Sequence, residues 1–284
     1  MGMPIHIDWD GVGVAAIPHD LRGPLIGFVA ALALAVAARF MRSGLLGAVA
    51  GGAGVVAGWY VIGGRLSVTY TRPSVDHLAF AAAVALAIAI LCEWLGRNRG
   101  APFALLLTAV FIGWWLCGAP RNQPELLQAW PIGLGVAVAV ALYARGQATD
   151  APAPLRLALT GLTMAASFHV VMLPPIWTQL ALVPALVSLA LFALPAMPGL
   201  SALPIAADIA TVGSLAVIDF GRLPHLRIGA VDVAAAAPLL ALWLTPHLTG
   251  RLQFAGRAAT ATAGVLAALV ATGVVWIAMR ALGR

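Results

Sequence analysis

One acidic residue lies where an acid is least expected, at the centre of a long apolar stretch. Asp208 has mostly apolar neighbours over residues 200–220, a length that suits one membrane-crossing helix. On that helix Ser201 and Asp219 fall within about 20° of the acid, and Thr211 lies beside them. Ionisable residues inside a membrane are costly and mark ion, proton or substrate pathways. The polar stripe therefore predicts a binding site for a coupling ion or a solute.

A proline adds a backbone ligand to this stripe. Pro204 lies four residues before Asp208 and has no N–H, so the carbonyl near Leu200 loses its helical donor. Carboxylate, hydroxyl and free carbonyl oxygens suit Na⁺, and a carboxylate can also hold a proton. The alternative is that Asp208 only hydrogen-bonds a neighbouring helix or lies at the membrane interface.

Two other ionisable residues are candidates for binding. Asp232 lies eleven residues before Trp243 and shares a helix face with it, although an acid near a helix start also complements the helix dipole. His169 could relay protons or ligate haem, but no second histidine has a matching position. Thr160 and Ser167, on the same helix, point roughly away from His169.

The motifs of cofactor and metal enzymes are not found in this sequence. It has no Walker motif, no H-E-x-x-H, no G-x-S-x-G and no C-x-x-C. Its two cysteines, Cys92 and Cys117, lie inside apolar segments and do not indicate a disulfide framework. We therefore expect no cofactor, no metal centre and no conventional active site.

The composition decides the class of protein. Of 284 residues, 62% are hydrophobic and 9% are charged, and the mean hydropathy is +0.99. A soluble domain is close to half apolar and a quarter charged, so a soluble enzyme, a nucleic-acid-binding domain and a disordered chain are excluded. All sixteen basic residues are arginines, most of them near the ends of apolar segments, where they anchor spans to lipid headgroups. The expected fold is an all-α, polytopic integral membrane bundle.

Ten apolar segments are long enough, or nearly long enough, to cross a bilayer. A spanning segment needs about 20 residues and must be helical, because no water satisfies its backbone. The segments cover residues 24–40, 44–64, 77–95, 102–119, 130–144, 155–173, 177–194, 200–220, 229–248 and 258–279.

The number of crossings has a range of eight to ten. The fifth segment is short, and the seventh and eighth are separated only by residues 195–199, so one pair of segments could be re-entrant. With ten spans the arginines divide equally between the two sides, and the positive-inside rule gives no orientation. If segments seven and eight cross only once, the count favours an external N-terminus.

The polar stretches divide the chain simply. Residues 1–23 form a polar N-terminal tail, and residues 24–284 form one transmembrane domain. A hydrophilic linker at 145–154 splits that domain into halves at 24–144 and 155–279, with five segments each. Because five is odd, duplicated halves would have opposite orientations, as in many secondary transporters.

Two short matches favour such an inverted repeat. Leu-Arg-x-x-Leu-x-Gly begins the first helix of each half, at Leu21 and at Leu155. The third helix of each half ends with an acid close to Gly-Arg, at Glu93 and at Asp219. A plan of two five-helix halves resembles the drug/metabolite transporter superfamily in helix number and symmetry alone, and no residue role is transferred.

The second segment is rich in glycine. Gly47 and Gly51 form one small-xxx-small pair, and Gly54 and Gly58 form another. Such pairs let a second helix approach closely, which drives helix association in lipid. The pattern predicts tight packing inside the bundle, and the alternative is a homodimer seam.

Three functions compatible with this class are ranked by these residues. A secondary transporter of a small solute, with Asp208 binding the coupling ion, comes first. A structural or assembly subunit of a larger membrane complex fits the short loops and the glycine-rich helix. A membrane enzyme acting on a lipid-linked substrate would use the loop of Asp219, Arg222, His225 and Arg227. The Ala, Gly and Arg bias favours a bacterial inner membrane, and the expected partners are lipid and a second membrane protein or copy, not nucleic acid.

Overall fold

The computed structural model describes six long helices and a few short pieces of the chain. The described residues are 18–63, 79–80, 82–84, 86–87, 90–91, 123–124, 153–173, 175–192, 230–249 and 257–282. No strand occurs among them, so the expected all-α class is confirmed for this part of the protein. The long helices are α1 (His19–Phe40), α2 (Gly44–Gly63), α6 (Ala153–Val170), α7 (Pro175–Phe192), α9 (Ala230–Thr249) and α10 (Arg257–Leu282).

These helices coincide with six of the ten predicted segments. The largest difference is at α1, which begins five residues before the expected start at Pro24. This proline lies in the second turn, where its missing N–H removes only one hydrogen bond near the helix start. The first turn closes instead on Pro18, whose carbonyl accepts the amide of Leu21 at 2.9 Å. Helix α6 begins inside the expected linker, at Ala153.

The chain reverses after α1 and after α6 by the same backbone motif. Arg42 and Met172 adopt left-handed φ angles of 50° and 54°. The amide after each of them donates back to the helix, to the carbonyls of Ala38 and Phe168 at 2.9 and 3.0 Å. This motif satisfies helix-end carbonyls within two or three residues. It turns α1–α2 and α6–α7 into antiparallel hairpins.

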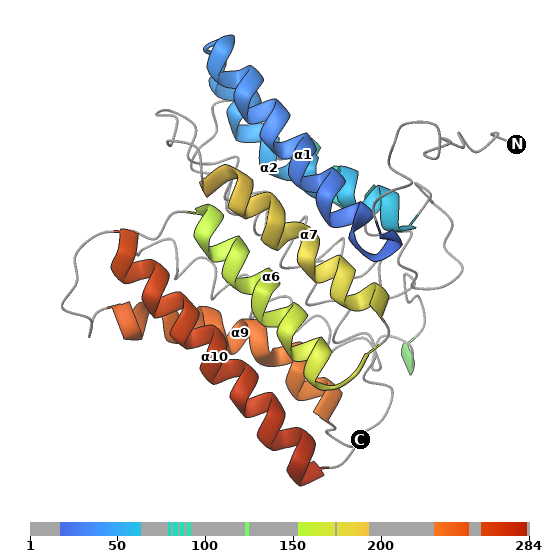
Figure 1. Ribbon diagram of the computed structural model, residues 1–284, viewed down its shortest axis with the longest axis vertical. Coiled ribbons are helices and arrows are strands. Elements are labelled where there is room, and N and C mark those ends of the chain that lie inside the picture. The colour runs from blue at the N-terminus through green and yellow to red at the C-terminus, as the bar shows by residue number, and fades with distance from the viewer. Residues whose placement is uncertain are drawn as a thin grey trace, which may run out of the picture.

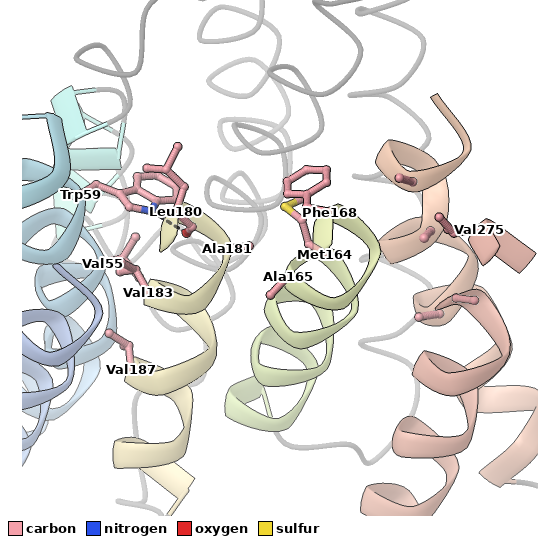
Figure 2. Close-up of a cluster of buried hydrophobic side chains, with 14 of the residues drawn as sticks. Val55, Trp59, Met164, Ala165, Phe168, Leu180, Ala181, Val183, Val187 and Val275 are labelled. Carbon is pink, nitrogen blue, oxygen red and sulfur yellow. Dashed lines mark hydrogen bonds between the residues drawn. The ribbon is translucent and has the colours of Figure 1, made fainter. Parts of the chain in front are cut away.

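The α6–α7 hairpin forms the centre of the described bundle (Figure 1). Helices α1 and α2 pack on α7, whereas α9 and α10 pack on α6. The buried core that joins them consists mainly of alanine and valine, with Trp59, Met164 and Phe168 as its largest side chains (Figure 2). Small residues at the interfaces bring the helix axes close together, which is the arrangement typical of membrane bundles.

Helix direction alternates across the bundle. Gly58 lies against Val183 and Gly51 against Leu191, so α2 and α7 are antiparallel. In Figure 1, α2, α6 and α10 run one way and α1, α7 and α9 run the other. Helix α2 therefore ends at the opposite end of the bundle from the start of α6. The end of α7 and the start of α9 are separated in the same way.

The two hairpins do not occupy equivalent positions. Helices α1 and α6 run in opposite directions, as inverted halves require. However, α7 packs along α1, while α2 and α6 share no comparable interface in the described bundle. An exact two-fold exchange of the halves would pair α2 with α6. The first residues of the proposed repeat also lie out of register, because Gly27 is fifteen residues before Arg42 and Gly161 is eleven before Met172.

Two described helices are long and apolar enough to cross a membrane by length and composition. They are Leu21–Phe40, with 20 residues, and Ala261–Leu282, with 22 residues. Val49–Gly63 and Pro175–Leu191 are shorter apolar helices. All charged residues in the six helices lie within four residues of a helix end, and α2 and α7 contain none.

Candidate functional site

The predicted ion-binding stripe lies outside the described residues. This applies to Asp208, Ser201, Thr211 and Asp219, and also to the arginine-rich loop that follows them. Asp232 is the third residue of α9, near the helix start as expected, and its side chain is also outside the described part. His169 is the next-to-last residue of α6 and is exposed. Among the described residues, no group of three or more His, Cys, Asp or Glu could hold a metal ion.

The glycine pairs of α2 lie mostly at contacts inside the bundle. A Cβ built on Gly54 would come within 2.7 Å of the Gly27 carbonyl, and one built on Gly27 within 2.8 Å of the Gly54 carbonyl. Gly23 and Gly58 form the same reciprocal contact at 2.9 Å. The backbones of α1 and α2 therefore touch at two levels. Only glycine permits this approach.

Helix α7 closes this contact from the third side. Val183 and Val187 both lie against the glycines of α1 and α2, and Leu191 lies against Gly51. Gly47 is half-buried, and its amide donates to the Ser43 carbonyl at 3.3 Å at the start of α2. Three helices thus meet on glycine backbone, and we call this contact the glycine joint.

A tryptophan joins α2 to a break in α7. Pro184 lies inside α7 and has no N–H, so the carbonyl of Leu180 has no helical donor. Trp59 of α2 supplies one instead, because its indole Nε1–H donates to that carbonyl at 3.0 Å (Figure 2). The Trp59 side chain is fully buried. Tryptophan buries a large apolar surface and needs one acceptor, and the proline provides it.

Most buried hydroxyls bond to their own helix. Thr163 donates to the Leu159 carbonyl at 2.7 Å, and Thr245 donates to the Ala241 carbonyl at 2.7 Å. Ser188 donates to the Pro184 carbonyl at 2.6 Å. These bonds to the residue four positions earlier let a hydroxyl enter an apolar core without a partner on another helix.

Exposed tryptophans lie at both ends of the bundle. Trp276, near the end of α10, stacks under Arg280, whose guanidinium carbon is 4.9 Å from the ring centroid. Trp243, near the end of α9, lies 4.8 Å from the ring of His247. The His247 Nδ1 is 2.9 Å from the Trp243 carbonyl oxygen, which accepts its hydrogen bond. Because α9 and α10 run in opposite directions, these pairs occupy opposite ends (Figure 1).

The candidate site therefore contains both predicted and unpredicted groups. The sequence signals for the unpredicted ones are a proline four residues after Leu180 and a tryptophan inside an apolar helix. Neither signal names its partner, because Trp59 and Leu180 belong to helices far apart in the chain. Comparison with known protein families, with curated proteins and with solved structures finds no match to this chain.

Proposed function

We propose that the chain is a multi-pass membrane protein with about ten spans that transports a small solute across a bacterial inner membrane. Its coupling ion would bind at Asp208. The observation that supports membrane insertion best is the distribution of charge. The central parts of all six described helices carry no charged residue, whereas their ends carry arginine, aspartate and histidine.

The outer surface supports the same proposal. Large apolar side chains are exposed along α1 and α10, among them Val29 at 59%, Leu269 at 64% and Ile277 at 61%. In water this surface would favour aggregation, but lipid chains solvate it. The exposed tryptophans at both ends correspond to the aromatic belts at the two membrane interfaces.

Helix direction supports the number of spans. The ends of α2 and α6 that face residues 64–152 lie at opposite ends of the bundle (Figure 1). An odd number of crossings in that interval satisfies this, and the sequence predicts three. The same argument applies to residues 193–229, where the sequence predicts one. A re-entrant pair formed by the seventh and eighth segments is therefore disfavoured.

The transport proposal depends on Asp208 and on the broken helices that flank its segment in the sequence. Pro184 interrupts α7, and Pro238 and Pro246 interrupt α9. Secondary transporters bind substrates and ions where discontinuous helices expose backbone groups near the membrane midplane. The mechanism would be alternating access, with occupation of Asp208 favouring one of two arrangements of the bundle.

Ion binding at Asp208 can be tested without knowing the solute. The full chain, purified in mild detergent, is unfolded by heat while Na⁺ replaces N-methylglucamine, and again as a function of pH. A coupling ion at about one hundred times its Kd raises the unfolding midpoint by roughly 5 °C. Asp208→Asn should abolish that shift.

The matched control is Asp232→Asn, because Asp232 lies at a helix start and not at a segment centre. This variant should keep the full response to the ion. Ion-independent stability of the native protein, or an unchanged response in folded Asp208→Asn, would exclude the proposed role of Asp208.

One observation favours the subunit alternative. Helix α10 has only 17% of its span buried, and its exposed face is continuous from Val265 to Ile277. A partner helix would cover this face as well as lipid does. Native mass spectrometry of the protein from its own membrane decides, because a stoichiometric second protein would replace transport by assembly as the leading function.

A further inference from the structure

One buried hydroxyl differs from the others. The Oγ of Ser167 on α6 is inaccessible to solvent and has no hydrogen-bond partner, a situation found for no other buried side chain in the described part of the chain. A buried hydroxyl without a partner costs about 1–3 kcal/mol. Such a group in a well-packed interior is therefore a sign that something small and polar belongs beside it.

The position of Ser167 on α6 identifies the neighbouring helix. Gly161 and Phe168 face α7, and Leu159 faces Gly264 of α10. The exposed residues of α6, such as His169, occupy the arc between those two contacts on one side. Ser167 occupies the opposite, buried arc, between the α7 and α10 directions. Helix α9 packs on both α6 and α10 and therefore lies on this side.

Helix α9 has an unsatisfied carbonyl at the corresponding level. Pro238 removes the N–H that would bond the carbonyl of Ala234. Ala234 is fully buried and belongs to the same core cluster as Phe168 and Met164 of α6. Because α6 and α9 are antiparallel, the late part of α6 lies beside the early part of α9 (Figure 1). The Ser167 hydroxyl does not reach this carbonyl directly, since no bond to it is formed.

We propose that one water molecule bridges α6 and α9, accepting a hydrogen bond from Ser167 and donating one to the Ala234 carbonyl. A buried water needs two to four polar partners, and these two groups provide the minimum set. Both groups are neutral, and the described central parts of α6, α9 and α10 contain no acid. The site therefore fits a neutral guest and not a cation, which would require more oxygen ligands and compensating charge.

The water would connect the break in α9 to the centre of the bundle. The first turns of α9, which include Asp232, lie before Pro238, and the remaining three turns follow it. A proline break is a point at which a helix bends. The bridge would hold the early part of α9 against α6, independently of any role in transport.

A double-mutant cycle tests the bridge. Thermal unfolding of the full chain in detergent, followed by tryptophan fluorescence, is compared for Ser167→Ala, Pro238→Ala and the double variant. With a bridging water, Ser167→Ala lowers the midpoint by about 2–4 °C, because the carbonyl loses its donor. In the Pro238→Ala background the restored N–H satisfies that carbonyl, so the effect of Ser167→Ala falls by at least half.

The control is Ser188→Ala, because Ser188 is equally buried but bonds to its own helix. Its effect should be the same with and without Pro238. A midpoint that rises or stays unchanged in Ser167→Ala would show a hydroxyl without a ligand and overturn the proposal. Strict additivity with Pro238→Ala would overturn it as well, as would a stabilisation by Na⁺ that Ser167→Ala removes.

A second measurement covers the case in which Pro238→Ala does not fold. Hydroxyl radicals made by X-ray pulses from a buried water oxidise the nearest reactive side chain, which is Met164, one turn before Ser167 and 2% exposed. Oxidation of Met164 should occur in the native protein and fall several-fold in Ser167→Ala. The absence of oxidation in the native protein, or equal oxidation in both, would contradict a bound water.

Discussion

The two flanks of the α6–α7 hairpin achieve close helix packing with different residues. On one side, the glycine joint brings the backbones of α1, α2 and α7 into direct contact. On the other side, α9 and α10 meet through alanine stripes. These stripes are Ala230, Ala234, Ala237 and Ala241 on α9, and Ala259, Ala263, Ala267 and Ala271 on α10, all at most 3% exposed. We call the second contact the alanine flank.

This difference shows how tolerance to movement is distributed in the bundle. Lipid is as apolar as leucine, so helix association depends on close packing and hydrogen bonds and not on water exclusion. At the glycine joint, backbone touches backbone, and any added atom must displace a helix. On the alanine flank, methyl groups separate the backbones. There α9 carries two prolines, at 238 and 246, and α10 leaves most of its surface uncovered.

The largest expected effect comes from adding one methyl group to the glycine joint. In Gly54→Ala, the new Cβ would lie 2.7 Å from the Gly27 carbonyl and 2.8 Å from the Ala31 Cβ. Neither neighbour is the end of a flexible side chain, so α1 must move. Overpacking of this kind costs about 1–3 kcal/mol. We expect the unfolding midpoint in detergent to fall by several degrees.

The control for this prediction is Gly51→Ala on the same helix. The nearest atom to its new Cβ is Cδ1 of Leu191, at 2.8 Å, which belongs to a flexible side chain that can rotate away. The loss should be less than half that of Gly54→Ala. Equal losses at both positions would show that helix α2 itself, and not the joint, is sensitive to substitution.

A smaller effect is expected at the bond between Trp59 and α7. Trp59→Phe keeps a ring in the core but removes the donor from the Leu180 carbonyl. An unsatisfied buried carbonyl costs about 1–3 kcal/mol, so the midpoint should fall by a few degrees. Adding Pro184→Ala restores a helical N–H to that carbonyl and should recover a large part of the loss. Recovery would not occur if Trp59 stabilised the joint through its volume alone.

The sequence predicts the helices of both flanks well and their partners poorly. Apolar length and the absence of charge locate the six helices within a few residues, because lipid-compatible backbone must be helical. Glycine spacing at positions 54 and 58 predicts close packing but not its target, since α1 and α7 offer equally apolar surfaces. The bond between Trp59 and Leu180 depends on the proline of a helix more than a hundred residues away. The buried side of Ser167 follows from its helix face, but its missing partner requires three-dimensional coordinates.

The smallest expected effect, and the sharpest test of the alanine flank, lies on the outer face of α10. A Cβ built on Gly273 meets no atom within 4 Å, so Gly273→Ala adds a methyl group to open space. In a helix facing lipid, alanine is favoured over glycine by up to about 1 kcal/mol, and the midpoint should stay unchanged or rise slightly. A fall in the midpoint, or a change in oligomeric mass by native mass spectrometry, would instead place a partner helix against this face. The contrast with Gly54→Ala is then decisive, because the same methyl group is harmful only where another backbone already occupies the space.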